Sequence, residues 1–156
     1  MKTIIIAGLF SIAATGAFAA DLTIDQLRTC RFDSLSLDRQ KEQLDSFGDD
    51  VDSERRTLDI KRPFLETRLA MINSFNGGTP EYNYSVREEF RRDAEEYNSL
   101  LRQYKRDKKI FNDRSDQYNE RVNRFNNSCV GKSASGADIQ EVCGDSNDEY
   151  CRGFDN

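Results

Sequence analysis

The residues of this chain with the clearest chemistry are its four cysteines, because the sequence contains no histidine. Without histidine, Ser-His-Asp and Cys-His catalytic machinery and every histidine-containing metal site are excluded. The cysteine spacings also lack the C-x-x-C pattern of redox and zinc sites. We therefore expect two structural disulfides, and of the three possible pairings we favour Cys30 with Cys129 and Cys143 with Cys151.

The acidic segment at residues 145–149 is a second chemical candidate, since it lies between the last two cysteines. Its oxygen-bearing side chains resemble the first half of a calcium-binding loop, but the central glycine and the distal bidentate glutamate are missing. We interpret the segment as a solvated loop and predict no metal site. An ion- or ligand-binding protein that uses this acidic C-terminal disulfide loop stays open as the alternative function.

The remaining carboxylates do not form an acid–base site. They lie along predicted helices, three or four residues from lysine or arginine, as in a solvated charge lattice. We therefore expect no catalytic residue, no cofactor and no enzymatic activity. The formal net charge of −5 argues against nucleic acid as a partner, because phosphate binding needs basic patches.

Two rows of apolar residues at seven-residue spacing dominate the pattern of the chain. If the chain folds back near residue 81, every aliphatic residue of the first row lies opposite an aromatic residue of the second. This pattern predicts an all-α fold, a long antiparallel two-helix coiled-coil hairpin. The rows are Leu37, Leu44, Val51, Leu58, Leu65 and Ile72, and Phe90, Tyr97, Tyr104, Phe111, Tyr118 and Phe125.

The predicted hairpin occupies residues 21–129. A capping box that begins at Thr23 indicates a short N-terminal helical turn, and the two main helices are expected over 33–75 and 80–127. Residues 76–80 carry a Gly-Gly-Thr-Pro turn signal. Pro63 lies inside the first helix on its outer face and predicts a hinge, that is, a kink that sets the angle of the hairpin tip.

The same fold-back explains the favoured disulfides, because it brings Cys30 close to Cys129. Such a bond closes a loop of roughly 100 residues and stabilises the fold by about 4–5 kcal/mol in the loop-entropy model. Cys143 and Cys151 then close a small loop within residues 130–156, which we predict to be an irregular acidic tail.

The register also predicts the second row of contacts between the helices. It places Phe47 opposite Ser115 and Glu54 opposite Lys108, so that an acid faces a base. Polar residues in such a seam fix the register at a cost in stability.

Residues 1–20 have the pattern of a cleaved signal peptide: a positive start at Lys2, a short apolar run and an Ala-Phe-Ala cleavage motif. The apolar run is too short for an integral membrane span. Together with the two expected disulfides, the signal-peptide pattern indicates a periplasmic or secreted protein.

Five apolar residues near the predicted turn lie outside the two rows: Ile60, Phe64, Met71, Val86 and Leu100. Four of them share heptad position g and therefore one side of the hairpin, where the corresponding positions farther from the turn are polar. We name these five residues the tip flank and expect it to bind another protein or a second copy of the chain. The sequence thus predicts an exported, non-enzymatic interaction module, with adaptor, chaperone and inhibitor or immunity protein left open.

Overall fold

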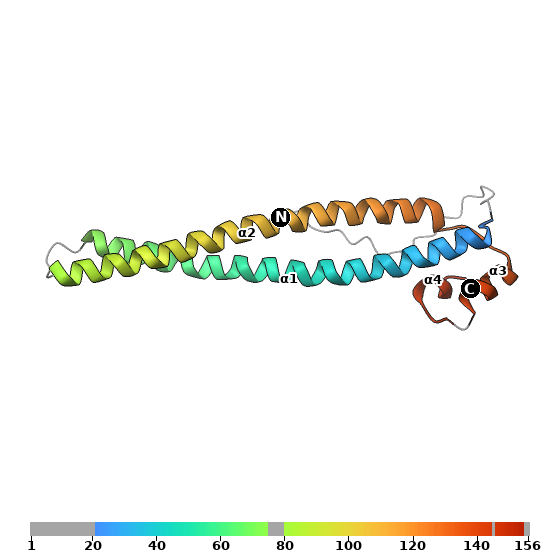
Figure 1. Cartoon of the computed structure of the whole chain (residues 1–156), viewed down its shortest axis with the longest axis horizontal. Coiled ribbons are helices and arrows are strands. Elements are labelled where there is room, and N and C mark those ends of the chain that lie inside the picture. The colour runs from blue at the N-terminus through green and yellow to red at the C-terminus, as the bar shows by residue number, and fades with distance from the viewer. Residues whose placement is uncertain (1–20, 75–79, 145, 155–156) are drawn as a thin grey trace. The chain divides into compact units, whose positions relative to one another are not determined.

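The described part of the computed structural model comprises residues 21–74, 80–144 and 146–154. It contains four helices and no strand: α1 (Ile24–Ser74), α2 (Pro80–Cys129), α3 (Gly136–Cys143) and α4 (Glu149–Arg152). The long helices α1 and α2 pack together (Figure 1), which confirms the predicted all-α hairpin. The predicted signal peptide and most of the predicted turn lie outside the described residues.

The chain divides into two units, which we describe separately. The hairpin unit is Leu37–Arg121, formed by the adjoining parts of α1 and α2. The disulfide unit combines the described residues of α1 up to Ser36 with the end of α2 and the tail, from Val122 onward.

The core of the hairpin unit is the seam between α1 and α2. Leu37, Leu44, Val51 and Leu58 are buried. The aromatic residues of the unit that lie opposite the last three, Tyr118, Phe111 and Tyr104 on α2, are half-buried. Large aromatic side chains cannot be fully covered by one neighbouring helix, which explains the difference. The seam is also less covered toward residues 75–79, since Leu65 and Ile72 are half-buried.

An aromatic contact fills the seam around Gly48. The Phe47 and Phe111 rings lie 6.4 Å apart between centroids, and a Cβ atom added at Gly48 would lie 3.0 Å from Phe111 Cε2. Ser115 is buried nearby and donates its hydroxyl to the Phe111 carbonyl at 2.8 Å. The glycine therefore leaves room for a ring that a larger residue would displace.

Helix α1 differs from the prediction because it is one continuous helix from Ile24 rather than a short turn followed by a helix from residue 33. The predicted capping box is present: Gln26 accepts from the Thr23 amide at 2.9 Å, and Thr23 Oγ1 accepts in return at 3.4 Å. No glycine or proline interrupts residues 24–47, so nothing ends the helix after its first turns. The helix also continues through the exposed Pro63, and the kink there stays a prediction.

The tail is another difference, because it contains helices α3 and α4 where the sequence predicts irregular structure. Both are N-capped: Ser135 accepts from the Asp138 amide, and Asp148 accepts from the Cys151 amide. Gly144, at φ 50°, follows the end of α3. Helices of eight and four residues are too short to display a heptad period, so seven-residue spacing does not predict them.

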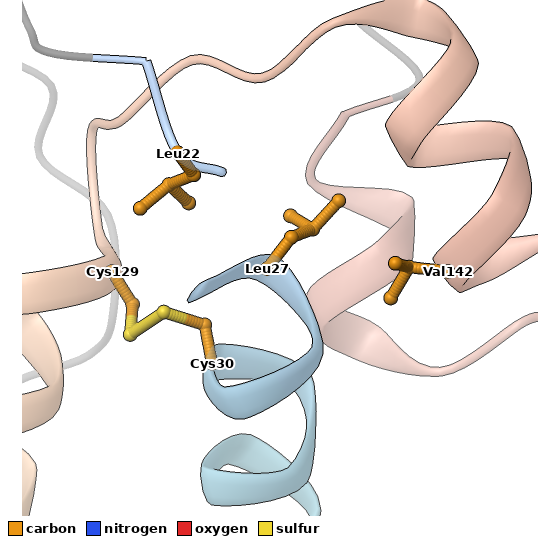
Figure 2. Packing of buried hydrophobic residues seen from close by; sticks show 5 residues of the cluster. All are labelled: Leu22, Leu27, Cys30, Cys129 and Val142. Carbon is orange, nitrogen blue, oxygen red and sulfur yellow. A yellow bond between two sulfur atoms is a disulfide. The ribbon is translucent and has the colours of Figure 1, made fainter. Parts of the chain in front are cut away.

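The disulfide unit has its own small core, formed by Leu22, Leu27, Cys30, Cys129 and Val142 (Figure 2). Disulfides join Cys30 to Cys129 and Cys143 to Cys151, the pairing that the sequence favours. The first bond ties the start of α1 to the end of α2, and the second holds α3 to α4. Half-buried apolar side chains surround this core, namely Ile24, Phe125, Ala134, Ile139, Tyr150 and Phe154.

Candidate interaction surface

The tip flank exposes large apolar side chains on α1. Ile60 is 74% exposed, Phe64 56% and Met71 58%. Their spacing of four and seven residues places them along one side of the helix. On α2, Val86 and Leu100 are half-buried.

Exposed apolar residues concentrate at this end of the hairpin unit. Nine large hydrophobic residues are exposed in the described part of the chain, and six of them lie between residues 60 and 84. Those six are Ile60, Phe64, Leu69, Met71, Tyr82 and Tyr84. Scattered single exposures would need no explanation, but such a concentration is typical of an interaction surface.

An ion pair that the sequence analysis missed crosses the tip flank. The Arg68 guanidinium lies over the Phe64 ring at 4.8 Å from its centroid and donates a hydrogen bond to Asp93 on α2. A second carboxylate, Glu89, lies 3.6 Å from the same guanidinium. Asp93 could have been found from the sequence, because it shares heptad position g with Val86 and Leu100. The flank is therefore apolar along α1 and interrupted by a carboxylate along α2.

Two further polar contacts join α1 to α2 in the same register as Arg68 with Glu89, and they lie one and two heptads farther from the turn. Lys61 Nζ lies 2.8 Å from Glu96 Oε1, and Gln103 Nε2 donates to Glu54 Oε1 at 2.6 Å. The second contact differs from the predicted pairing of Glu54 with Lys108. Lys108 instead lies over the Tyr104 ring of its own helix, at 5.6 Å from the centroid. The lysine side chain is long enough to reach either group, and the backbone register does not decide which of them it contacts.

Glu54 also has carboxylates near it. Burial raises its pKa, and the negative charges of Asp107 and Asp50 raise it further, against the lowering effect of the Gln103 hydrogen bond. The second carboxylate oxygen, Oε2, is buried and has no hydrogen-bond partner among the described residues. The middle of the seam therefore disfavours a negative charge at Glu54.

In the disulfide unit, the acidic loop is bound by Arg31. This arginine, which the sequence analysis did not single out, donates to Asp148 and Ser146, both at 2.8 Å, and to the Val142 carbonyl. The pKa of Asp148 lies below its usual value. Burial raises this pKa, but the hydrogen bonds from Cys151, Ser146 and Arg31, together with the charge of Arg31, lower it by more.

These contacts disfavour a cation site in the acidic loop, the alternative that the sequence leaves open. Asp148 is held by an arginine, an amide and a hydroxyl, so a cation would have to displace Arg31. The structurally described residues contain no group of three or more histidine, cysteine, aspartate or glutamate side chains placed to hold a metal ion. Asp145 lies outside those residues.

Comparisons of the chain with protein-family models, with curated proteins and with solved structures found no match. Within the part of the chain that is described, no helix combines the length and the apolarity needed to cross a bilayer. A functional proposal for this chain therefore depends on its own surface chemistry.

Proposed function

We propose that the protein is an exported, non-enzymatic helical hairpin that binds another protein through the tip flank. The observation that carries this proposal is the exposure of Ile60, Phe64 and Met71 on one side of α1. Each apolar side chain transferred from water to an interface contributes about 25 cal/mol per Å² of buried surface. The burial of these side chains against another protein therefore supplies a driving force for association.

Two observations support export. The signal-peptide pattern of residues 1–20 directs a chain out of the cytoplasm. All four cysteines are paired, and such bonds persist in the periplasm and outside the cell rather than in the reducing cytosol. Both locations suit the proposal, and so do the three roles of adaptor, chaperone and inhibitor.

A pull-down with surface variants tests the proposal. The chain without residues 1–20 is immobilised and incubated with periplasmic extract or culture medium, and the bound proteins are compared with those bound by Ile60→Asp with Phe64→Asp. Ile110→Asp is the control, since Ile110 is also exposed (41%) but lies on α2, outside the concentration of exposed apolar residues between residues 60 and 84. We expect the double variant to lose the bound protein while the control keeps it, with unchanged helicity by circular dichroism.

The same experiment separates the three roles. An inhibitor or immunity protein would bind one protein tightly, an adaptor a fixed set, and a chaperone many unfolded proteins. If the double variant binds the same proteins as the unmodified chain, the tip flank is not the binding surface and the proposal fails.

A further inference from the structure

A row of uncharged residues runs along α1 in the part of the hairpin unit that carries the tip flank. Its members occupy heptad positions c and g, which alternate at spacings of three and four residues, as in the contact row of a coiled coil. The row extends over about 25 Å of helix. We name it the uncharged row, and its residues are Thr57, Ile60, Phe64, Thr67, Met71 and Ser74.

The uncharged row is suited to contact with apolar side chains. One third of the residues in the chain are charged, yet none of these six is. Five of them are exposed, and Thr57 is half-buried. Two of the hydroxyl groups already have acceptors within the helix, because Thr57 donates to the Ser53 carbonyl and Ser74 to the Met71 carbonyl, both at 3.0 Å. Among the described residues, α1 thus packs one row against α2 and leaves a second row exposed.

The neighbouring side of α2 carries negative charge. In an antiparallel pair, position g of both helices lies on the same side. Positions c and g of α2 contain three carboxylates and no lysine or arginine between residues 82 and 103. We name these carboxylates the acidic row: Glu89, Asp93 and Glu96.

Two members of the acidic row can accept a further cation. Asp93 accepts the hydrogen bond from Arg68, whereas the Glu89 carboxylate lies 3.6 Å from that guanidinium and accepts none of the hydrogen bonds found among the described residues. The Glu89 side chain is 52% exposed. The Glu96 side chain is 62% exposed and contacts Lys61 through one oxygen, Oε1. Because a carboxylate has about four acceptor sites, Glu89 and Glu96 keep acceptor capacity toward solvent.

The two rows together favour one kind of occupant. A second copy of the chain fits poorly, because contact between two uncharged rows brings two acidic rows together. Contact of an uncharged row with an acidic row instead leaves carboxylates against apolar side chains. An anionic membrane surface is repelled by the exposed carboxylates. A helix with an apolar row and basic residues beside it complements both rows.

We propose that this face of the hairpin binds a basic amphipathic α-helix of the partner protein and forms a three-helix coiled coil with it. The apolar side chains of that helix pack on the uncharged row, and its lysines or arginines pair with Glu89 and Glu96. A helix fits better than an extended strand, because it repeats its apolar residues at the same spacing of three and four residues. This inference rests on the proposed function, since it names the chemistry of the partner that the tip flank binds.

Fluorescence with defined peptides tests the proposal. The probe is a synthetic helical peptide of three heptads, with leucines at two positions of each heptad, lysines beside them and one tryptophan. The chain itself contains no tryptophan, so the tryptophan signal comes from the peptide alone. We expect this lysine peptide to bind about tenfold more tightly than a peptide with glutamate in place of lysine, and added salt to reduce the difference. No binding, or equal binding of the two peptides, overturns the proposal.

Charge variants assign the basic contacts. Glu89→Gln with Glu96→Gln should weaken binding of the lysine peptide about fivefold, the effect of two exposed ion pairs. Glu88→Gln with Glu95→Gln is the matched control, because it removes the same charge from positions of α2 outside the acidic row, where both carboxylates pair with Arg91. The same loss in both double variants would show a general charge effect and overturn the assignment.

A variant of the uncharged row separates packing from charge. Thr67→Asp adds a negative charge, so electrostatics alone would tighten binding of the lysine peptide, whereas a carboxylate buried against leucine weakens it. We expect affinity to fall about tenfold. Asn73→Asp, at an exposed position of α1 outside the row, keeps full affinity. Equal or tighter binding by Thr67→Asp overturns packing on this row. A dimer of the unmodified chain that Thr67→Asp dissociates, measured by sedimentation, overturns the choice of occupant.

The outcomes also distinguish this inference from the proposed function. If Ile60→Asp with Phe64→Asp loses its partner in the pull-down but the lysine peptide never binds, only the helix chemistry fails. If that double variant keeps its partner while the peptide binds the unmodified chain and not Thr67→Asp, the proposed function fails although the face binds a basic helix. Tighter binding of the chain to vesicles of anionic lipid than to the peptide overturns the choice of a protein partner.

Discussion

The Arg68 guanidinium lies 4.8 Å from the centroid of the Phe64 ring while it hydrogen-bonds to Asp93 on the other long helix. One side chain therefore covers part of the tip flank and joins α1 to α2. Because Arg68 and Asp93 are both about one quarter exposed, their ion pair is better shielded than a surface pair. The flank that we propose as a binding surface is thus also supported by a contact across the seam.

Arg68→Ala should destabilise the hairpin unit, because Asp93 and Glu89 lose their shared cation. We expect a loss of about 1 kcal/mol in the free energy of unfolding. For a chain of this size that corresponds to a fall of roughly 2–4 °C in the melting temperature. Arg91→Ala is the control, since Arg91 pairs within α2, with Glu88 and Glu95, and is 61% exposed. A larger fall for the control would show that the cross-helix pair contributes little.

The two disulfides should differ in their contributions. The Cys30–Cys129 bond spans 99 residues and the Cys143–Cys151 bond spans 8. In the loop-entropy model, replacing the first pair with alanine costs about 4–5 kcal/mol and replacing the second costs about 2–3 kcal/mol. Urea denaturation of the two alanine double variants measures the difference, and equal losses would refute the loop-length explanation.

Glu54 should make the hairpin unit less stable as the pH rises. Because the Glu54 pKa is raised above its usual value of 4.5, the folded state still holds a proton that the unfolded state has already released. Stability is therefore lost as the pH increases from about 4.5 through the higher pKa of the folded state. We expect Glu54→Gln to flatten this dependence and to be more stable than the unmodified chain at pH 7.

Urea denaturation of both proteins at pH 4 and pH 7 measures this effect. Glu42→Gln, at an exposed position of α1, is the control for removal of a negative charge. A pH dependence that is the same in the Glu54→Gln variant as in the unmodified chain would show that Glu54 keeps its charge in the folded protein at no cost.

Arg31→Ala should loosen the tail of the disulfide unit, because three acceptors lose the same donor group. We expect faster amide hydrogen exchange in α3 and α4 and a loss of about 1–3 kcal/mol. Arg28→Ala is the control, since Arg28 and its partner Glu141 are both more than half exposed. Comparable exchange in the two variants would argue against a holding role for Arg31.

The same contact gives a second pH effect of opposite sign. The lowered pKa of Asp148 means that its stabilising contribution is present above about 3.8 and is lost as the pH falls through the lower pKa of the folded state. In Arg31→Ala, the exchange rates of α4 should therefore depend less on pH in the acidic range. An unchanged dependence would show that Arg31 is not the group that lowers the Asp148 pKa.

The sequence alone determined the pairing of α1 with α2 and its register. Residues that recur every seven positions lie along one side of a helix, so their spacing in the sequence is enough to place them in the seam. The exposure of Ile60, Phe64 and Met71 follows from the same register. So does the Cys30–Cys129 pairing, since opposite positions of a hairpin have a fixed relation in sequence.

Only the tertiary structure decided which long polar side chains meet. Arg68 reaches Asp93, Lys108 turns to Tyr104, and Arg31 binds the tail. Several partners lie within reach of each of these flexible side chains, and local packing selects one, which the backbone register does not specify. Arg114 likewise lies over the Phe47 ring on the other long helix.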